Sequence, residues 1–224
     1  MAKRLQGKRT LLTQSRDFMG PAIAELFREE GSEVYSDCRD LTVPGACAAL
    51  VAEVGHIDVL VINLAISNPR AAAHQTTDDQ WDAVFARLVH PMHRLTRAVL
   101  PQMMTRRSGK IIVVGSAAAL RGTKNRSCYG AARGAQHAYV RNVGIEVAPH
   151  NVQVNATGQI FVENPTYFPP EVIGTPELAA RLAEVPAGRL STGREAAALI
   201  LFLASEESNF ISGHIFPYAG GWVV

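Results

Sequence analysis

The sequence predicts an α/β fold in which helices cover both faces of a doubly wound parallel sheet, and three observations support this. Strand-like apolar runs alternate with helix-like segments along all 224 residues. The runs 58–63 and 110–114 are almost entirely apolar, as in strands buried on both faces. No internal repeat or linker interrupts the pattern. We therefore expect residues 1–224 to form a single Rossmann-like domain.

The individual elements follow from local patterns in chain order. Short apolar or β-branched runs predict strands at 10–13, 33–36, 58–63, 110–114, 152–156 and 215–217. Helical spacing of apolar residues predicts helices at 19–30, 44–54, 78–104, 128–148, 177–184 and 194–204. Gly31 would end the first helix, and Pro91 would bend the third. The loop 158–175 is long and rich in proline and aromatic residues, so we expect it to serve the ligand site.

Composition argues against several classes of protein. The net charge is only +2 and no Lys/Arg run is dense, so we expect no nucleic-acid or membrane partner. No apolar run approaches the ~18 residues of a membrane span, and the N-terminus lacks a signal-peptide core. The three cysteines have no metal-ligand spacing, which fits a reducing cytoplasm. His90 and His93 share a helix face without a third ligand, so we expect no metal site.

A tyrosine and an arginine four residues apart form the first candidate site. Tyr129 and Arg133 lie in a helix-like segment, where positions i and i+4 share a face. A cation next to a phenol favours the phenolate and lowers its pKa, so Tyr129 is a candidate general base near neutral pH. Ser116 ends an apolar strand thirteen residues upstream and is a candidate hydrogen-bond donor. Spacing alone also permits an ordinary surface pair.

This order of motifs resembles the short-chain dehydrogenase/reductase superfamily over nearly the whole chain. In that family a catalytic Ser follows the fourth strand, a Tyr comes about thirteen residues later, and a basic residue lies four beyond; Ser116, Tyr129 and Arg133 match. Residues 211–221, ISGHIFPYAGG, resemble the family's terminal T-G-x-x-x-x-x-x-G-G. The resemblance implies a Rossmann-like fold.

The first turn departs most from the family pattern. The family sequence T-G-x-x-x-G-x-G is here TQSRDFMG at 13–20, so Gln14 and Phe18 replace two glycines. Those glycines let the backbone approach a pyrophosphate closely. Their loss predicts that no nucleotide cofactor binds. Asp37 ends the second strand, where an acidic residue would hold a ribose, and we interpret it as a remnant or a turn residue.

Three further departures lie outside that turn. The third-strand motif N-N-A-G is NLAI at 63–66, and P-G after the fifth strand is Gln159-Ile160. Arg133 replaces a lysine that contacts the nicotinamide ribose, and a guanidinium retains the charge that tunes the tyrosine. His90 stands where a catalytic asparagine would lie.

A Ser-Tyr-Arg set with an altered nucleotide turn resembles the halohydrin dehalogenases, and the form of the turn resembles their B-type branch. That resemblance implies cofactor-independent, reversible conversion of vicinal haloalcohols into epoxides and halide, with epoxide opening by azide, cyanide or nitrite. It implies a halide pocket in the vacated nicotinamide space, where backbone N–H groups form an anion nest and aromatic edges add partial positive charge. Carried over by position, the halide-binding residues are Gln159, Ile160, Phe161, Val162, Tyr167, Phe168 and Phe18.

The same resemblance implies a homotetramer built through the helices at 78–104 and 128–148. Other residues expected to line or approach the pocket are Ala118, Ala119, Asn68, Pro69 and 222–224. Two alternatives remain open: an NAD(P)-dependent short-chain reductase with a divergent Gly-rich loop, and a scaffold that has lost its chemistry. Retention of the serine, tyrosine and cation argues against the scaffold.

Overall fold

Six parallel strands form one sheet in the order β2-β1-β3-β4-β5-β6. The computed structural model describes residues 3–67, 70–164 and 166–223. The strands are β1 (Arg9–Leu12), β2 (Glu33–Ser36), β3 (Val59–Ile62), β4 (Gly109–Ser116), β5 (Val152–Gln159) and β6 (Ile215–Tyr218). The predicted doubly wound parallel α/β sheet is therefore confirmed.

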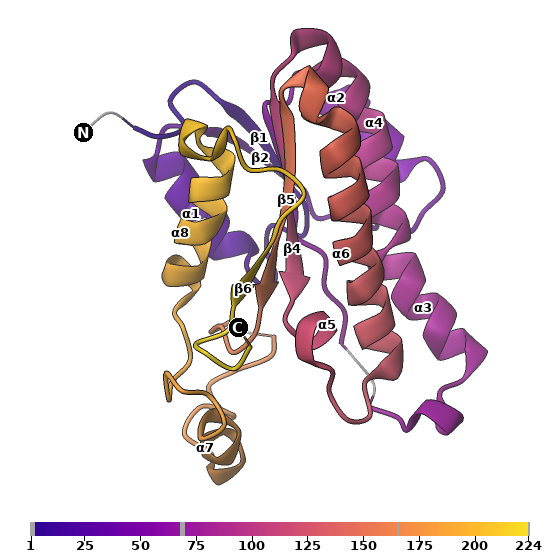
Figure 1. Ribbon diagram of the computed structural model, residues 1–224, viewed down its shortest axis with the longest axis vertical. Coiled ribbons are helices and arrows are strands. Elements are labelled where there is room, and N and C mark those ends of the chain that lie inside the picture. The colour runs from indigo at the N-terminus through magenta and orange to yellow at the C-terminus, as the bar shows by residue number, and fades with distance from the viewer. Residues whose placement is uncertain (1–2, 68–69, 165, 224) are drawn as a thin grey trace.

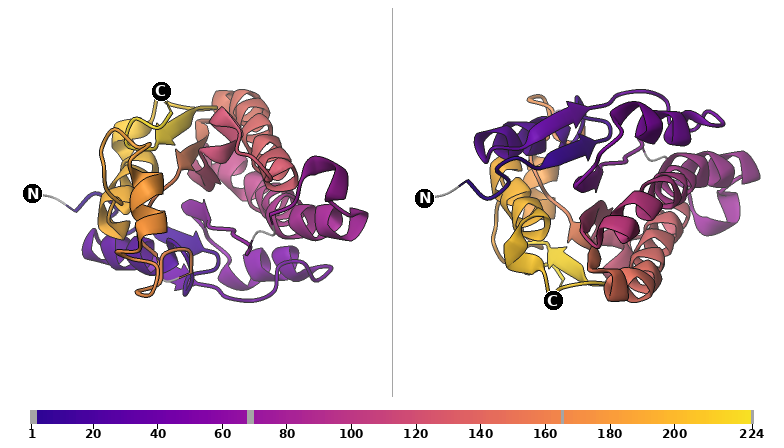
Figure 2. Two further views of the ribbon diagram at one scale, coloured as in Figure 1. Left: turned by 90° about the horizontal axis from the view of Figure 1, so that it is seen from below. Right: turned by 90° about the horizontal axis from the view of Figure 1, so that it is seen from above.

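Helices cover both faces of this sheet (Figures 1 and 2). One face carries α1 (Gly20–Glu29) and α8 (Gly193–Ala204); the other carries α2 (Ala46–Val54), α4 (His90–Arg106) and α6 (Ser127–Val147). The remaining helices are α3 (Asp78–Leu88), α5 (Ala118–Arg121) and α7 (Pro176–Leu182), with 3₁₀ turns η1 (Ala73–Gln75), η2 (Ala148–His150) and η3 (Glu206–Ser208). No helix within the described ranges is long and apolar enough to cross a membrane.

Side chains that alternate along the strands pack into two separate hydrophobic cores. In β3 and β4, Leu60 and Ile111 point to the layer of α2, α4 and α6, whereas Val61 and Ile112 point to α1 and α8. Successive strand residues face opposite sides, so a strand covered on both faces must be apolar throughout. Each such aliphatic side chain stabilises the fold by roughly 1.5–3 kcal/mol.

The largest differences from the predicted elements lie at two places. The helix predicted at 78–104 is two helices that meet at Val89, because Pro91 falls in the first turn of α4, where its missing N–H is tolerated. Gln159 was predicted in a loop but ends β5. It pairs with Ser116 of β4 and Tyr218 of β6, and these two ladders extend the strand beyond residue 156.

The site lies where the strand order reverses. The chain runs from β1 outward to β2, then returns to place β3 on the other side of β1. A crevice opens at such a switch point, outside the carboxyl ends of the strands.

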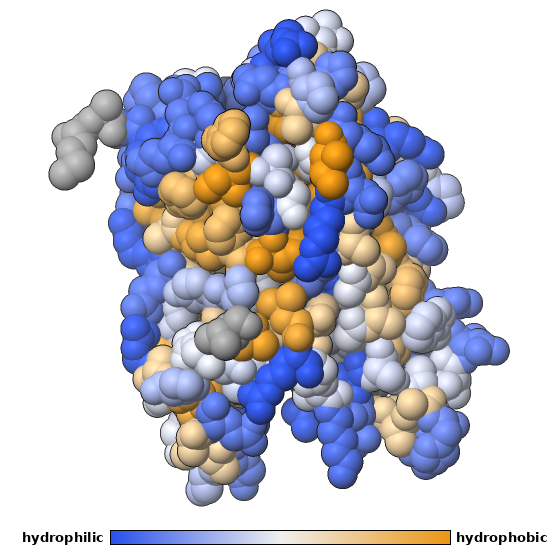
Figure 3. Space-filling view, viewed as in Figure 1, coloured by the Kyte–Doolittle hydropathy of each residue, from blue (hydrophilic) through white to orange (hydrophobic). Residues whose placement is uncertain are grey.

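The edge of the sheet formed by β6 has an apolar surface. Apolar side chains gather over this outer strand, between α8 and α6 (Figure 3).

Candidate active site

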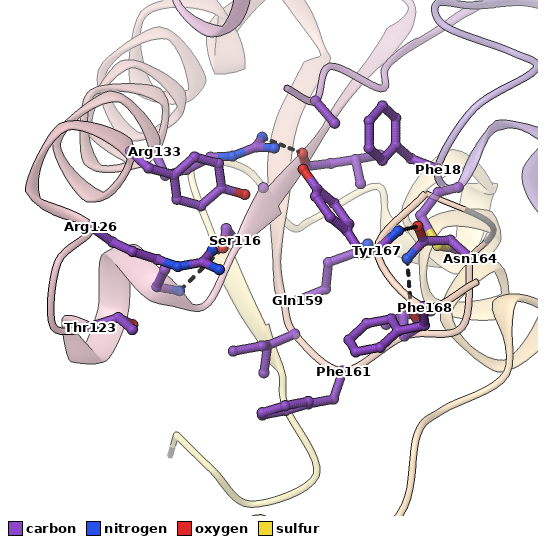
Figure 4. Close-up of a pocket in the computed structure, with 18 of the residues that line it drawn as sticks. Phe18, Ser116, Thr123, Arg126, Arg133, Gln159, Phe161, Asn164, Tyr167 and Phe168 are labelled. Carbon is purple, nitrogen blue, oxygen red and sulfur yellow. Dashed lines mark hydrogen bonds between the residues drawn. The ribbon is translucent and has the colours of Figure 1, made fainter. Parts of the chain in front are cut away.

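A cavity of about 450 Å³ opens at the carboxyl ends of the strands. Its walls come from the first turn, the loops after β3 and β5, the end of β4 and the start of α6 (Figure 4). All ten residues predicted for catalysis or halide binding line it: Ser116, Tyr129, Arg133, Phe18, Gln159, Ile160, Phe161, Val162, Tyr167 and Phe168. The fold thus brings the whole predicted set together around one space.

Arg133 is fixed behind the phenol of Tyr129. Both side chains lie on α6 and are buried, with 3% and 6% of their surface exposed. The Arg133 Cζ lies 5.2 Å from the centre of the tyrosine ring. Its Nη1 donates to the Val114 carbonyl at 3.0 Å and its Nη2 donates to the Leu64 carbonyl at 2.8 Å. These bonds anchor the cation to the ends of β3 and β4.

The two tyrosines of the cavity differ in acidity. Burial, the largest effect, raises the pKa of Tyr129, but the Arg133 charge and hydrogen bonding with Ser116 lower it, and the net shift is downward. Burial and the neighbouring Tyr129 raise the pKa of Tyr167 to about 12. Tyr167 donates its hydroxyl proton to the Ile66 carbonyl at 2.9 Å. Tyr129 is therefore suited to accept a proton, whereas Tyr167 stays a donor.

The first turn keeps a glycine-like backbone without the glycines. Gln14 and Phe18 have φ values of +43° and +53°, in the left-handed region that glycine favours. The Gln14 Oε1 accepts a hydrogen bond from the Ala65 amide at 2.7 Å, which connects the turn to the loop after β3. The Phe18 ring packs on Tyr167, with 5.0 Å between ring centres. Side chains therefore occupy this part of the crevice.

The loop after β5 is organised by a residue that the sequence reasoning missed. The Asn164 Oδ1 accepts from the amides of Thr166 and Tyr167, and its Nδ2 donates to the Val162 carbonyl. An Asn-Pro pair at 164–165 is a turn signal that could have identified it. The loop thereby holds Tyr167 against the cavity.

The loop after β5 has fewer free N–H groups than the predicted anion nest requires. The Ile160 amide donates to the Tyr218 carbonyl at 3.1 Å, so it is not free to face a ligand. Phe161 has a φ of +55°, which bends the loop sharply at that point. Within the described part of the chain, no protein acceptor receives the amides of Phe161 or Val162. These two N–H groups are therefore available as hydrogen-bond donors in this loop.

Other predicted residues are placed as follows. Ala118 and Trp222 line the cavity, and the Trp222 ring lies 6.3 Å from Phe161; Ala119 is outside the described lining. Asn68, Pro69 and Val224 lie outside the described residues, and Val223 is not in the described lining.

Residues considered for other roles have structural partners. Asp37 accepts from the amide and Nε of Arg39, which fits a turn residue. His93 contacts the Tyr139 hydroxyl at 3.3 Å, and the residues described contain no cluster of potential metal ligands.

Comparisons with known proteins place the chain in a family. A family model described as enoyl-(acyl carrier protein) reductase matches residues 5–223. The chain is a member of the short-chain dehydrogenase/reductase family. It is 31% identical to the 3-oxoacyl-[acyl-carrier-protein] reductase of Vibrio harveyi over 97% of this chain and 98% of the relative. It is 28% identical to the enzyme of the same name from Thermotoga maritima, over 99% and 100%.

The present chain also resembles a solved structure. That structure is named "Dehalogenation enzyme", shares 32% sequence identity and superposes with a TM-score of 0.92, covering 98% of this chain and all of that one. The sequence identity of this chain to a reductase and to a dehalogenation enzyme is nearly the same. Sequence identity therefore does not distinguish the two functions, and the chemistry of the site must do so.

Proposed function

We propose that this protein is a halohydrin dehalogenase, which converts a vicinal haloalcohol into an epoxide and a halide ion without a nucleotide. The observation that carries the proposal is the joint placement of the Ser116-Tyr129-Arg133 set and the Phe18-Tyr167 pair in one cavity. The resemblance to a solved dehalogenation enzyme supports it.

The residues of the first turn do not fit a dinucleotide. The Gln14 side chain accepts from the Ala65 amide, and the Phe18 ring packs on Tyr167. In this proposal, these side chains occupy the space that the pyrophosphate and nicotinamide of a dinucleotide need. Arg133 donates from Nη1 to the Val114 carbonyl and to Gln136, and from Nη2 to the Leu64 carbonyl, so three of its N–H groups are engaged inside the protein. No step of the proposed mechanism uses a nucleotide.

In the proposed mechanism Tyr129 is the general base. The Arg133 cation favours its phenolate, and Ser116 holds the substrate hydroxyl oxygen against it by a hydrogen bond. As Tyr129 takes the hydroxyl proton, the oxygen lone pair forms a bond to the neighbouring carbon. The carbon–halogen bond breaks and its electron pair leaves with the halide. The proton then passes to water, so one haloalcohol gives an epoxide, a halide ion and a proton.

The halide leaves toward the loop after β5. The free amides of Phe161 and Val162 supply hydrogen-bond donors, and the rings of Phe18 and Tyr167 close the other side. Oriented N–H groups that stabilise a leaving anion lower the barrier as an oxyanion hole does. The reverse reaction follows from microscopic reversibility: azide, cyanide or nitrite opens an epoxide through the same site.

The decisive experiment measures halide release from 1,3-dichloro-2-propanol by nucleotide-free protein. We expect release to proceed at the same rate with or without added NADPH. The competing function is the reductase suggested by the curated relatives. Under that reading NADPH raises the melting temperature by mass action and no halide appears, and this pair of results would refute the proposal.

A further inference from the structure

Three arginines that the proposed mechanism does not use converge on the cavity. Arg70 precedes η1, Arg126 stands at the N-cap of α6, and Arg181 lies in the last turn of α7. The segments carrying the first two are joined by a bridge between Ala71 and Arg126 and by a hydrogen bond from the Ala71 amide to the Asn125 carbonyl. Their spacing is therefore set by the backbone.

Two of these side chains lie beside residues of the predicted site. The Arg126 guanidinium points into the cavity beside Ser116, and its Cζ lies 5.9 Å from the ring centre of Tyr129 (Figure 4). The Arg181 Cζ lies 5.4 Å from the ring of Phe161 and 5.9 Å from that of Phe168. One cation thus stands near the candidate base, and another stands over the aromatic side of the cavity.

Several arginines elsewhere in the molecule form ion pairs with carboxylates, whereas others, such as Arg28, donate to uncharged acceptors. The three cavity arginines form no ion pair among the described residues. Arg39, Arg189 and Arg194 form ion pairs of 2.6–2.8 Å with Asp37, Glu195 and Glu29. Among the residues that the structure describes, no carboxylate oxygen lies within 4 Å of the nitrogens of Arg70, Arg126 or Arg181.

The three cations repel one another. Burial and then Arg70 lower the pKa of Arg126, and burial followed by Arg70 and Arg126 lowers the pKa of Arg181. Glu184 is the acidic residue in the described lining, and its charge opposes this effect at Arg181 without an ion pair. The cavity wall outside Arg133 therefore carries three positive charges and one negative charge. A cluster of cations with a net positive charge favours binding of an anion.

We propose that the preferred substrate carries a carboxylate or phosphate group, bound by Arg126, Arg181 and Arg70, beside the carbons that react. This rests on the proposed dehalogenation, and it adds the substrate class. Planar guanidinium groups donate paired hydrogen bonds to either anion, so the site recognises their shared chemistry. The hydroxyl and halogen of such a substrate would face Tyr129 and the loop after β5.

The test compares charged and neutral haloalcohols of similar size. In wild-type protein we expect kcat/KM for 4-chloro-3-hydroxybutyrate or 3-chloro-2-hydroxypropyl phosphate to exceed that for 1-chloro-2-butanol. The better of the two anions identifies the group. In Arg126→Gln and Arg181→Gln the ratio of charged to neutral kcat/KM should fall by roughly tenfold or more, as expected for the loss of a charged hydrogen bond. The ratio cancels any loss that a variant causes for both substrates.

Arg28→Gln is the matched control, since Arg28 lies on α1 outside the cavity and donates to Ser36. It should leave the ratio unchanged. An unchanged ratio in both cavity variants would overturn the proposal. A second result would also overturn it: the ratio of charged to neutral kcat/KM stays constant in the cavity variants while the KM for azide in epoxide opening rises. The arginines would then bind small anions only.

A binding measurement separates this proposal from the proposed function. Thermal shifts with 3-hydroxybutyrate and with neutral 1,2-butanediol require no turnover. Stabilisation by the acid alone, lost in the Arg126→Gln/Arg181→Gln double variant, supports the anion site even if no haloalcohol reacts. Equal shifts from both compounds would overturn it even if the neutral haloalcohol is turned over.

Discussion

The first turn and the start of α6 line the same cavity but preserve different parts of the family pattern. At α6, Tyr129 and Arg133 keep the spacing and contact of a tuned phenol. In the first turn, Gln14 and Phe18 have a left-handed backbone at the positions of the missing glycines. The Phe18 side chain lines the cavity, and the Gln14 side chain accepts from the Ala65 amide. A fold can thus keep its proton-transfer groups while changing what lies opposite them, because each depends on a different loop.

The largest expected effect tests the part that is preserved. Tyr129→Phe removes the proton acceptor and leaves the ring, so halide release and azide-dependent epoxide opening should both fall by about 10³-fold. The measurement is single-turnover halide release, with the melting temperature as a check on folding. Substantial activity in a folded Tyr129→Phe protein would show that the preserved region is structural only.

A second prediction concerns the pH dependence of the same region. Because the net effect of its surroundings lowers the pKa of Tyr129, the wild-type phenolate persists to lower pH than a free tyrosine would allow. Arg133→Gln removes the charge, so that pKa rises and the acid limb of the kcat/KM profile moves to higher pH. Arg133→Lys keeps a charge and should move it less. Identical limbs in all three proteins would contradict the assignment of Tyr129 as base.

A third prediction tests whether the altered turn has acquired a binding role. Phe18→Ala removes one ring of the Phe18-Tyr167 pair. If that pair closes the halide site, the inhibition constant for bromide should rise roughly twofold to tenfold, the scale of one aromatic contact. Phe85→Ala is the control, since Phe85 stacks on Trp81 outside the cavity. An unchanged constant in Phe18→Ala would show that the turn only fills space.

The sequence predicted the parts of the site that depend on local spacing. Tyr129 and Arg133 follow helical periodicity, and Ser116 follows from the apolar strand that it ends. The residues predicted to bind halide were located by family position, and all of them line the cavity. Gln159 was misplaced because β5 is extended by pairing with distant Tyr218, which a local pattern does not contain.

The missed residues depend on packing between distant segments. Arg181 reaches the cavity because α7 packs through Leu178 on Phe161 and Phe168 in a small separate core. Arg126 is aligned by the bridge to Ala71, which lies more than fifty residues earlier. In the sequence, each looks like an ordinary surface arginine. Neither spacing nor composition distinguishes such a residue from one that a carboxylate neutralises.

The smallest expected effect distinguishes strain from contact in the first turn. Gln14→Gly relieves a φ of +43° but loses the hydrogen bond to the Ala65 amide, two effects of about 1 kcal/mol each and of opposite sign. Gln14→Ala loses the same bond and keeps the strain. We therefore expect the glycine variant to unfold in urea with nearly the wild-type free energy and the alanine variant to be less stable by about 1 kcal/mol.

Equal stability of the two variants would show that the left-handed backbone at Gln14 carries no strain, and that the contact to Ala65 alone fixes the turn. The same pair can be assayed for NADPH binding by thermal shift. If nucleotide binds to Gln14→Gly and not to Gln14→Ala, the backbone path for a pyrophosphate survives beneath the glutamine. If nucleotide binds to neither variant, Phe18 and Tyr167 exclude it without help from Gln14. The difference between the first turn and the start of α6 would then not depend on the Gln14 side chain alone.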